Sequence, residues 1–96
     1  MVVGVVRLDL VLHAPLSLKE KRGRVKKLVA RIRNHYPVSC AETDSHDLWQ
    51  RVGISVAMVA MEEAEIQRVF TKIEEDLQRD GLAELADRDC EILHYS

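Results

Sequence analysis

Aromatic residues are scarce in this chain of 96 residues, which has two tyrosines, one tryptophan and one phenylalanine. Sheet proteins that bind single-stranded nucleic acid stack bases on aromatic side chains of their central strands. The four aromatics here are Tyr36, Trp49, Phe70 and Tyr95, and none lies in the apolar segments 2–13 and 52–60. Base stacking on such strands is therefore excluded.

Cysteine is also rare, and long apolar runs are absent. Cys40 and Cys90 lack the C-x-x-C spacing of metal or redox sites and are too few for a disulfide scaffold. We interpret both as small buried apolar residues. No apolar run approaches the ~18 residues of a membrane span, and Arg7 and Asp9 interrupt the N-terminal segment, which no cleavage site follows. We expect a cytoplasmic protein without a membrane partner.

Opposite charges are separated along the chain. Residues 1–35 carry a net charge of +7, residues 36–61 carry −2 and residues 62–96 carry −7. The segment Lys19–Arg33 holds eight of the fourteen Lys and Arg residues but a single acid, Glu20. Such a separation produces strong local electrostatic fields, although the net charge of the whole chain is only −2.

Apolar periodicity predicts six elements in one domain, residues 1–96. Strands are expected at 2–13, 38–43, 52–60 and 85–95, the last with a bulge or an edge position because its alternation is poor. Helices are expected from Leu18 to just before Pro37 and from Glu62 to Asp80. Ser17 and Glu20 form a capping box at the start of the first helix. The second expected helix follows Ala60 and Met61, which provide no polar capping residue.

The order βαββαβ predicts an α+β fold of the ferredoxin-like kind, a two-layer sandwich. Its four-stranded antiparallel sheet has the strand order 4-1-3-2, and both helices lie on one face. The other face is then uncovered and carries small and apolar side chains. These are expected to be Val3, Val5, Arg7, Asp9, Val11, Ser39, Ala41, Thr43, Ser55, Ala57 and Val59. Such a surface is a liability in a monomer, so a homodimer through this face is predicted.

The basic helix is the candidate binding site. A helical projection places Lys19, Arg22, Lys26 and Arg33 on one flank and Arg24, Lys27 and Arg31 away from the core. Acids that would pair with these bases four residues away are missing, and cations in the first turns oppose the helix dipole. A phosphate or other anion would offset both effects. The residues predicted to bind a polyanion are Lys19, Lys21, Arg22, Lys26 and Lys27, although Lys21 lies near the apolar stripe.

A second polar patch lies between the two middle strands. Its three carboxylates and one imidazole within six residues suggest hard-metal binding or acid–base chemistry, but no ligand spacing matches a recognisable site. No metal and no cofactor are therefore predicted. The residues of this possible secondary site are Glu42, Asp44, His46, Asp47, Trp49 and Arg51.

Three runs of residues together are similar to those of a known family. Ser17-Leu18-Lys19-Glu20-Lys21-Arg22 opens the first helix, while Val38-Ser39-Cys40-Ala41-Glu42 and Asp47-Leu48-Trp49-Gln50-Arg51 flank the hairpin. The chain thereby resembles the YlxP-like family of small bacterial proteins, domain of unknown function 503, over nearly its whole length. The resemblance implies a ferredoxin-like fold and a cytoplasmic location. It also implies gene neighbours in translation initiation and ribosome maturation, hence ribosomal or other structured RNA, and no established catalytic residues.

Three functions follow from the sequence. The leading one is a homodimeric binding protein, without enzymatic activity, that holds structured RNA or a ribonucleoprotein through the basic helix. The first alternative is an interaction or structural module whose basic helix meets an acidic protein surface, such as the second helix of another copy. The other alternative is a small-ligand or metal-dependent enzyme at the 42–51 segment.

Overall fold

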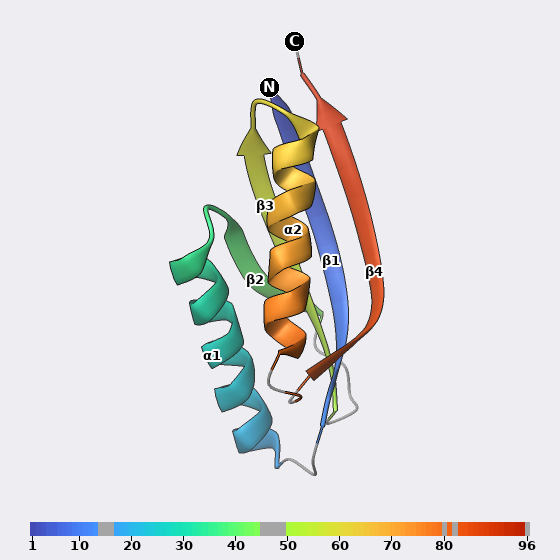
Figure 1. Ribbon diagram of the computed structural model, residues 1–96. Helices are drawn as coiled ribbons and strands as arrows, with labels where there is room; N and C mark the ends of the chain where they lie inside the picture. The colour runs from blue at the N-terminus through green and yellow to red at the C-terminus, as the bar shows by residue number, and fades with distance from the viewer. Residues whose placement is uncertain (14–16, 45–49, 80, 82, 96) are drawn as a thin grey trace.

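The computed structural model describes residues 1–13, 17–44, 50–79, 81 and 83–95 (Figure 1). The elements are β1 (Val2–Leu12), α1 (Leu18–His35), β2 (Ser39–Asp44), β3 (Arg51–Ala60), α2 (Glu63–Gln78) and β4 (Ala83–His94). Each of the six predicted elements is present, with bounds within about two residues of those expected. Neither helix of the described part combines the length and apolar character needed to cross a membrane.

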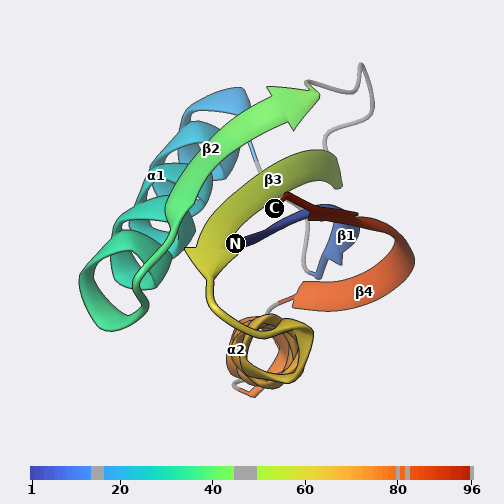
Figure 2. The same cartoon turned by 90° about the horizontal axis from the view of Figure 1, so that it is seen from above.

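The four strands form one antiparallel sheet in the order β2-β3-β1-β4. This is the predicted order read from the opposite edge, so the ferredoxin-like arrangement is confirmed. Both helices lie on the same side of the sheet (Figure 2). Helix α1 packs beside β2, and α2 packs mainly over β4 and β1. We call the other side of the sheet the open face.

The core lies between the sheet and the helices. Alternate residues of β1, among them Leu8, Leu10 and Leu12, are fully buried against residues of α2 such as Phe70 and Ile73. The period of two in the strand and of three to four in the helix produces this layer directly from the sequence. Close approach of α2 to β1 also requires Gly4, since a Cβ there would collide with Ile66 Cγ2 and lie 3.2 Å from Phe70 Cε2.

The predicted irregularity of the last strand is a shift in its register with β1. Asp9 pairs with Asp87, whereas the next residue, Leu10, pairs with Leu85. Ala86 is therefore the extra residue of a β-bulge, which changes the face to which the following side chains point. Ala83 is consequently buried in the core, whereas Leu93 is exposed.

The start of α1 is capped by Ser17, as predicted. The Ser17 hydroxyl accepts from the backbone N–H of Glu20 at 3.1 Å and donates to the Glu20 carboxylate at 3.2 Å. Glu20 thus bonds the serine side chain rather than reaching back to its backbone N–H, as a full capping box would. The N-cap of α2 is Glu62, and it makes no side-chain capping bond.

Pairing across the sheet fixes which residues share the open face. Val3 lies opposite both Val59 and Leu93, and Val5 lies between Ala57 and Glu91. The same face continues along β4 with Asp89 opposite Arg7. The open face is thus apolar at the end where β1 begins and charged farther along, where Arg7 lies 3.3 Å from Asp9.

The two cysteines lie on opposite edge strands and are free thiols. Cys40 is buried as predicted, whereas Cys90 is only half-buried. Burial raises the pKa of the Cys40 thiol from 9.0 to about 11, and the nearby Arg33 guanidinium opposes this effect.

We therefore expect iodoacetamide to alkylate Cys40 far more slowly in the native protein than in urea at pH 8. A pKa two units higher lowers the reactive thiolate fraction about 100-fold. Mass spectrometry of the Cys40 peptide measures the rate, and half-buried Cys90 is the internal control. Equal rates for Cys40 in the native and unfolded protein would contradict its burial.

Candidate nucleic-acid interface

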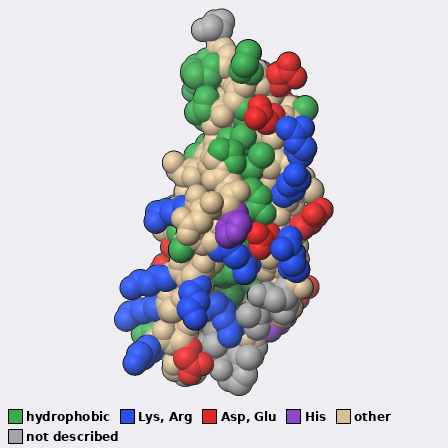
Figure 3. Space-filling model, turned by 60° about the vertical axis from the view of Figure 1, so that its left-hand side comes forward, with side chains coloured by type: hydrophobic (Ala, Val, Ile, Leu, Met, Phe, Trp, Pro, Cys, Tyr) green, Lys and Arg blue, Asp and Glu red, His purple; other side chains and the backbone are tan. Residues whose placement is uncertain are grey.

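Four cations of α1 form an exposed surface, which we call the basic face: Lys19, Arg22, Lys26 and Lys27. Lys19, Arg22 and Lys26 follow one another at spacings of three and four residues, and Lys27 comes next, so the four lie within about 12 Å along the helix axis. Lys and Arg side chains gather over α1 in the space-filling view (Figure 3). Within the described residues, none of these four forms an ion pair or hydrogen bond.

The other three arginines of α1 bond to neighbouring elements. Arg24 donates to the carbonyl of His13 at 2.9 Å, at the end of β1. Arg33 Nε donates to the carbonyl of Cys40 on β2 at 2.8 Å. Arg31 Nε lies 3.1 Å from Asp76 Oδ1 of α2. The predicted flanks were therefore wrong for Arg24 and Arg31, which fasten α1 to the rest of the domain instead of pointing away from it.

Lys21 does not belong to the basic face. Its side chain is only 5% exposed and lies among the buried residues of α1, at helical spacing from Val25, Leu28 and Ile32. The long aliphatic stem of a lysine can cover apolar surface in this way. Of the five residues predicted to bind a polyanion, four are accessible and Lys21 is not.

No acid of the described residues forms an ion pair with a cation of the basic face. Glu20 is the acid of the first turn of α1, and it is engaged with Ser17. Lys19 and Arg22 lie near the helix N-terminus, where the dipole disfavours a cation by ~0.3–1 kcal/mol. An external anion would relieve this repulsion and would meet the backbone N–H groups of the first turn.

A hollow of about 230 Å³ lies beside the basic face, between α1 and the edge strand β2. Lys26 and Arg33 line its rim with Glu42, and the small side chain of Ala30 leaves the space open. The described site is thus a convex helix flanked by a shallow depression.

The predicted secondary site is not brought together among the described residues. Glu42 pairs with Ile54, on the helix side of the sheet, whereas Asp44 pairs with Gly53, on the open face. One residue, Thr43, bulges between these pairs and separates the two carboxylates. Arg51 pairs with Val11, and His46, Asp47 and Trp49 lie outside the described residues. The described His, Cys, Asp and Glu residues contain no group of three that could hold a metal ion.

Comparison with known proteins identifies the family. Residues 3–90 match the family model described as a protein of unknown function, DUF503. The chain belongs to this family. It is 33% identical over 76 residues to the uncharacterized protein YlxP of Bacillus subtilis strain 168, a match that covers 75% of this chain and 83% of that protein.

Solved structures resemble this DUF503 chain to different degrees. The structural-genomics protein YJCS superposes with a TM-score of 0.64 at 15% identity, over 93% of this chain and 96% of the other. A mutant of SnoaB, a cofactor-independent oxygenase from Streptomyces nogalater, gives 0.49 at 10% identity, over 98% and 92%. A dabb family protein with a ferredoxin-like fold from Mesorhizobium loti gives 0.36 at 19% identity, over 97% and 98%. The likeness to YJCS concerns the fold alone.

One polar cluster of this DUF503 chain was missed by sequence reasoning. Asp76 is 8% exposed, and its carboxylate meets Arg31 Nε at 3.1 Å and the Tyr36 hydroxyl at 3.0 Å. Burial, and then the hydrogen bond to Asp76, raises the pKa of the Tyr36 phenol above its ordinary value of 10.0. An acid at the buried position of a helix, seven residues after Val69 and close to Ile73 and Leu77, is the sequence signal that could have revealed it.

Proposed function

We propose that this DUF503 protein binds structured RNA through the basic face of α1. The observation that carries the proposal is a difference between the cations of one helix. Arg24, Arg31 and Arg33 bond to neighbouring elements, whereas Lys19, Arg22, Lys26 and Lys27 bond to no other described residue. Clustered cations with no acidic partner among the described residues fit a ligand that brings its own negative charge.

The expected mode of binding depends on which side chains the open face carries. Strands β1 and β3 carry no aromatic side chain, so bases have nothing to stack on there. Contacts to phosphates, made by lysine and arginine side chains, hold the backbone without reading the bases. Gene neighbours implied by the family resemblance favour RNA over an acidic protein. Binding is expected to be sensitive to salt and weakly selective for sequence.

The test replaces Lys19, Arg22, Lys26 and Lys27 together with glutamine. Glutamine is a good helix former, so the melting temperature should change little. The plot of log binding constant against log salt concentration should become shallower by up to ~0.7–0.9 per lost phosphate contact. Fluorescence anisotropy with a labelled RNA hairpin measures this slope.

Matched removal of charge from α2 is the control. Arg68 and Lys72 are exposed on that helix, where acids are plentiful, and Arg79 is exposed at its C-cap. Replacing these three with glutamine should leave the salt slope unchanged. The RNA proposal fails if the α1 variant binds as tightly as the wild type, or if the wild type does not bind at low salt. Binding to an acidic protein but not to RNA would favour the interaction-module alternative.

A further inference from the structure

Exposed apolar side chains gather at one end of the open face. Of the seven large hydrophobic residues that are exposed in the described structure, Leu18 alone belongs to α1. The other six lie on the strands where β1 begins, or directly beyond their ends. We call these six the apolar end: Met1, Val5, Val59, Met61, Leu93 and Tyr95. Val59 is 62% exposed, since β2 pairs with β3 only as far as Ala57 and Val3 of β1 is the one described strand neighbour of Val59. Apolar surface gathered in this way is typical of an interaction site.

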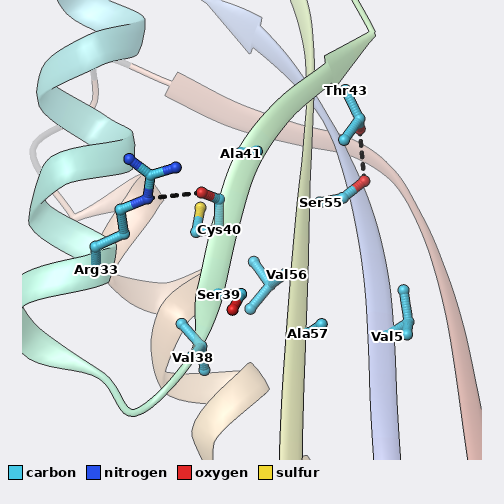
Figure 4. Close-up of a pocket in the computed structure, with 10 residues that line it drawn as sticks. All are labelled: Val5, Arg33, Val38, Ser39, Cys40, Ala41, Thr43, Ser55, Val56 and Ala57. Atoms are coloured by element: carbon cyan, nitrogen blue, oxygen red, sulfur yellow. Dashed lines mark hydrogen bonds between the residues drawn. The ribbon is translucent and has the colours of Figure 1, made fainter.

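A hollow of about 430 Å³ adjoins the apolar end (Figure 4). Val5 of β1 lines one side, and small side chains of β2 and β3, including Ser39, Ala41 and Ala57, line the rest. Two of the three hydroxyls that line it, those of Thr43 and Ser55, are hydrogen-bonded to each other at 2.5 Å, and Ser39 supplies the third. The open face is therefore raised on the β1 and β4 side and hollowed on the β2 and β3 side.

We infer that a second copy of the chain covers this face. A twofold axis parallel to the strands, between β1 and β3, would place β1 of one copy over β3 of the other and β4 over β2. The raised half of each copy then meets the hollowed half of its partner, and Val5 of each copy projects toward the other's Ala57. The two apolar ends are covered at the same time, as an isologous interface requires.

The size of the face agrees with this occupant. A sheet of four strands, about ten residues long in its central strands, spans roughly 19 by 33 Å, or about 600 Å² before side-chain relief is counted. Stable interfaces bury about 800 Å² on each partner. The face can supply most of that area without help from the helices, so the inferred dimer does not depend on the proposed RNA contact.

Charge supports the same arrangement at the level of Val5, whereas farther along the strands the same axis would place Asp87 of one copy over Asp44 of the other. Glu91 of β4 lies on the open face beside Val5, and Arg33 lies at the β2 margin of the hollow. The twofold axis that places β4 over β2 carries Glu91 of one copy toward Arg33 of the other. Arg33 Nε is bonded to the Cys40 carbonyl, which holds the guanidinium at this margin. Two such pairs would flank the apolar centre of the dimer.

Sedimentation of the wild type at high micromolar concentration should give twice the monomer mass. Ala57→Glu places a carboxylate in the hollow and should weaken the dimer about 100-fold or more. Ala64→Glu, the same change at an exposed position of α2, should leave it intact. Val59→Lys is a second variant that should disrupt the dimer, at a well-exposed residue. It tests the inference even if Ala57→Glu does not fold.

A charge exchange tests the orientation. Glu91→Arg and Arg33→Glu should each weaken the dimer, and the double variant should regain at least about tenfold in dimerisation affinity over either single variant. Melting temperatures exclude unfolding as the cause. A monomeric wild type, or a dimer that survives both Ala57→Glu and Val59→Lys, would overturn the inference. Lack of recovery in the double variant would overturn the twofold arrangement.

Discussion

Replacing Gly4 with alanine is expected to lower the free energy of unfolding by about 2–3 kcal/mol, although only one methyl group is added. The new Cβ would overlap Ile66 Cγ2 and press on Phe70 and Ile92, both 3.2 Å away. Relief requires α2 to move away from β1, where the largest buried side chain, Phe70, is packed. For a domain of this size the change corresponds to a fall in melting temperature of about 8–24 °C.

Gly23 provides the matched control for the same methyl group. It lies in the interior of α1, and a Cβ there would meet nothing within 4 Å. Gly23→Ala should therefore raise stability by up to about 1 kcal/mol through helix propensity alone. Chemical denaturation of both variants measures the change in the free energy of unfolding, which should be negative for Gly4→Ala and positive for Gly23→Ala. Destabilisation by both, or by neither, would show that the spacing between α2 and β1 is not what Gly4 maintains.

Replacing Asp76 with alanine is the second large effect that we expect, a loss of about 2–3 kcal/mol of stability. The variant leaves the Tyr36 hydroxyl and Arg31 Nε without the carboxylate that they share. Because the Arg31 side chain is 34% exposed, water can replace part of what it loses. Thermal and urea unfolding of Asp76→Ala and the wild type measure this loss of stability.

Titration of Tyr36 reports the same cluster separately. Its raised pKa means that folding is favoured below the phenol's ordinary pKa near 10, and that this contribution is lost as the pH rises through the folded value. In Asp76→Ala the phenol should ionise at a lower pH than in the wild type, as measured by tyrosinate absorbance. Tyr36→Phe identifies the signal and should cost only about 1 kcal/mol. An unshifted titration with unchanged stability would contradict a shared carboxylate.

The fold was predictable because its signals are local. Alternation along β1, the cap at Ser17 and the uneven pattern around Ala86 each depend on a few neighbouring residues, and all three features are present in the structure. The element order and the sheet order followed from them. Packing partners were not predictable in this way, since they depend on distances between elements that a single periodic pattern does not contain.

The candidate site shows the same limit. A helical projection identified the exposed cations Lys19, Arg22, Lys26 and Lys27, but it could not show that Arg31 reaches Asp76, a residue 45 positions away. Lys21 is different, because its spacing from Val25 and Leu28 already placed it near the apolar stripe. Sequence alone therefore identified the charged helix, and the structure distinguished the cations that bond to no described residue from the arginines that bond to neighbouring elements.

The outer edge of β4 determines how far self-association can extend. This strand of twelve residues has β1 as its sole strand neighbour in the described sheet, so its other side is an edge onto which further strands could add indefinitely. Glu84, Asp87, Asp89 and Glu91 are exposed along it, and two such edges would repel each other. At the other edge, the carbonyl of Cys40 is already bonded to Arg33. Fibre-like growth through either edge is thereby discouraged, and association that uses a face closes on itself after two copies.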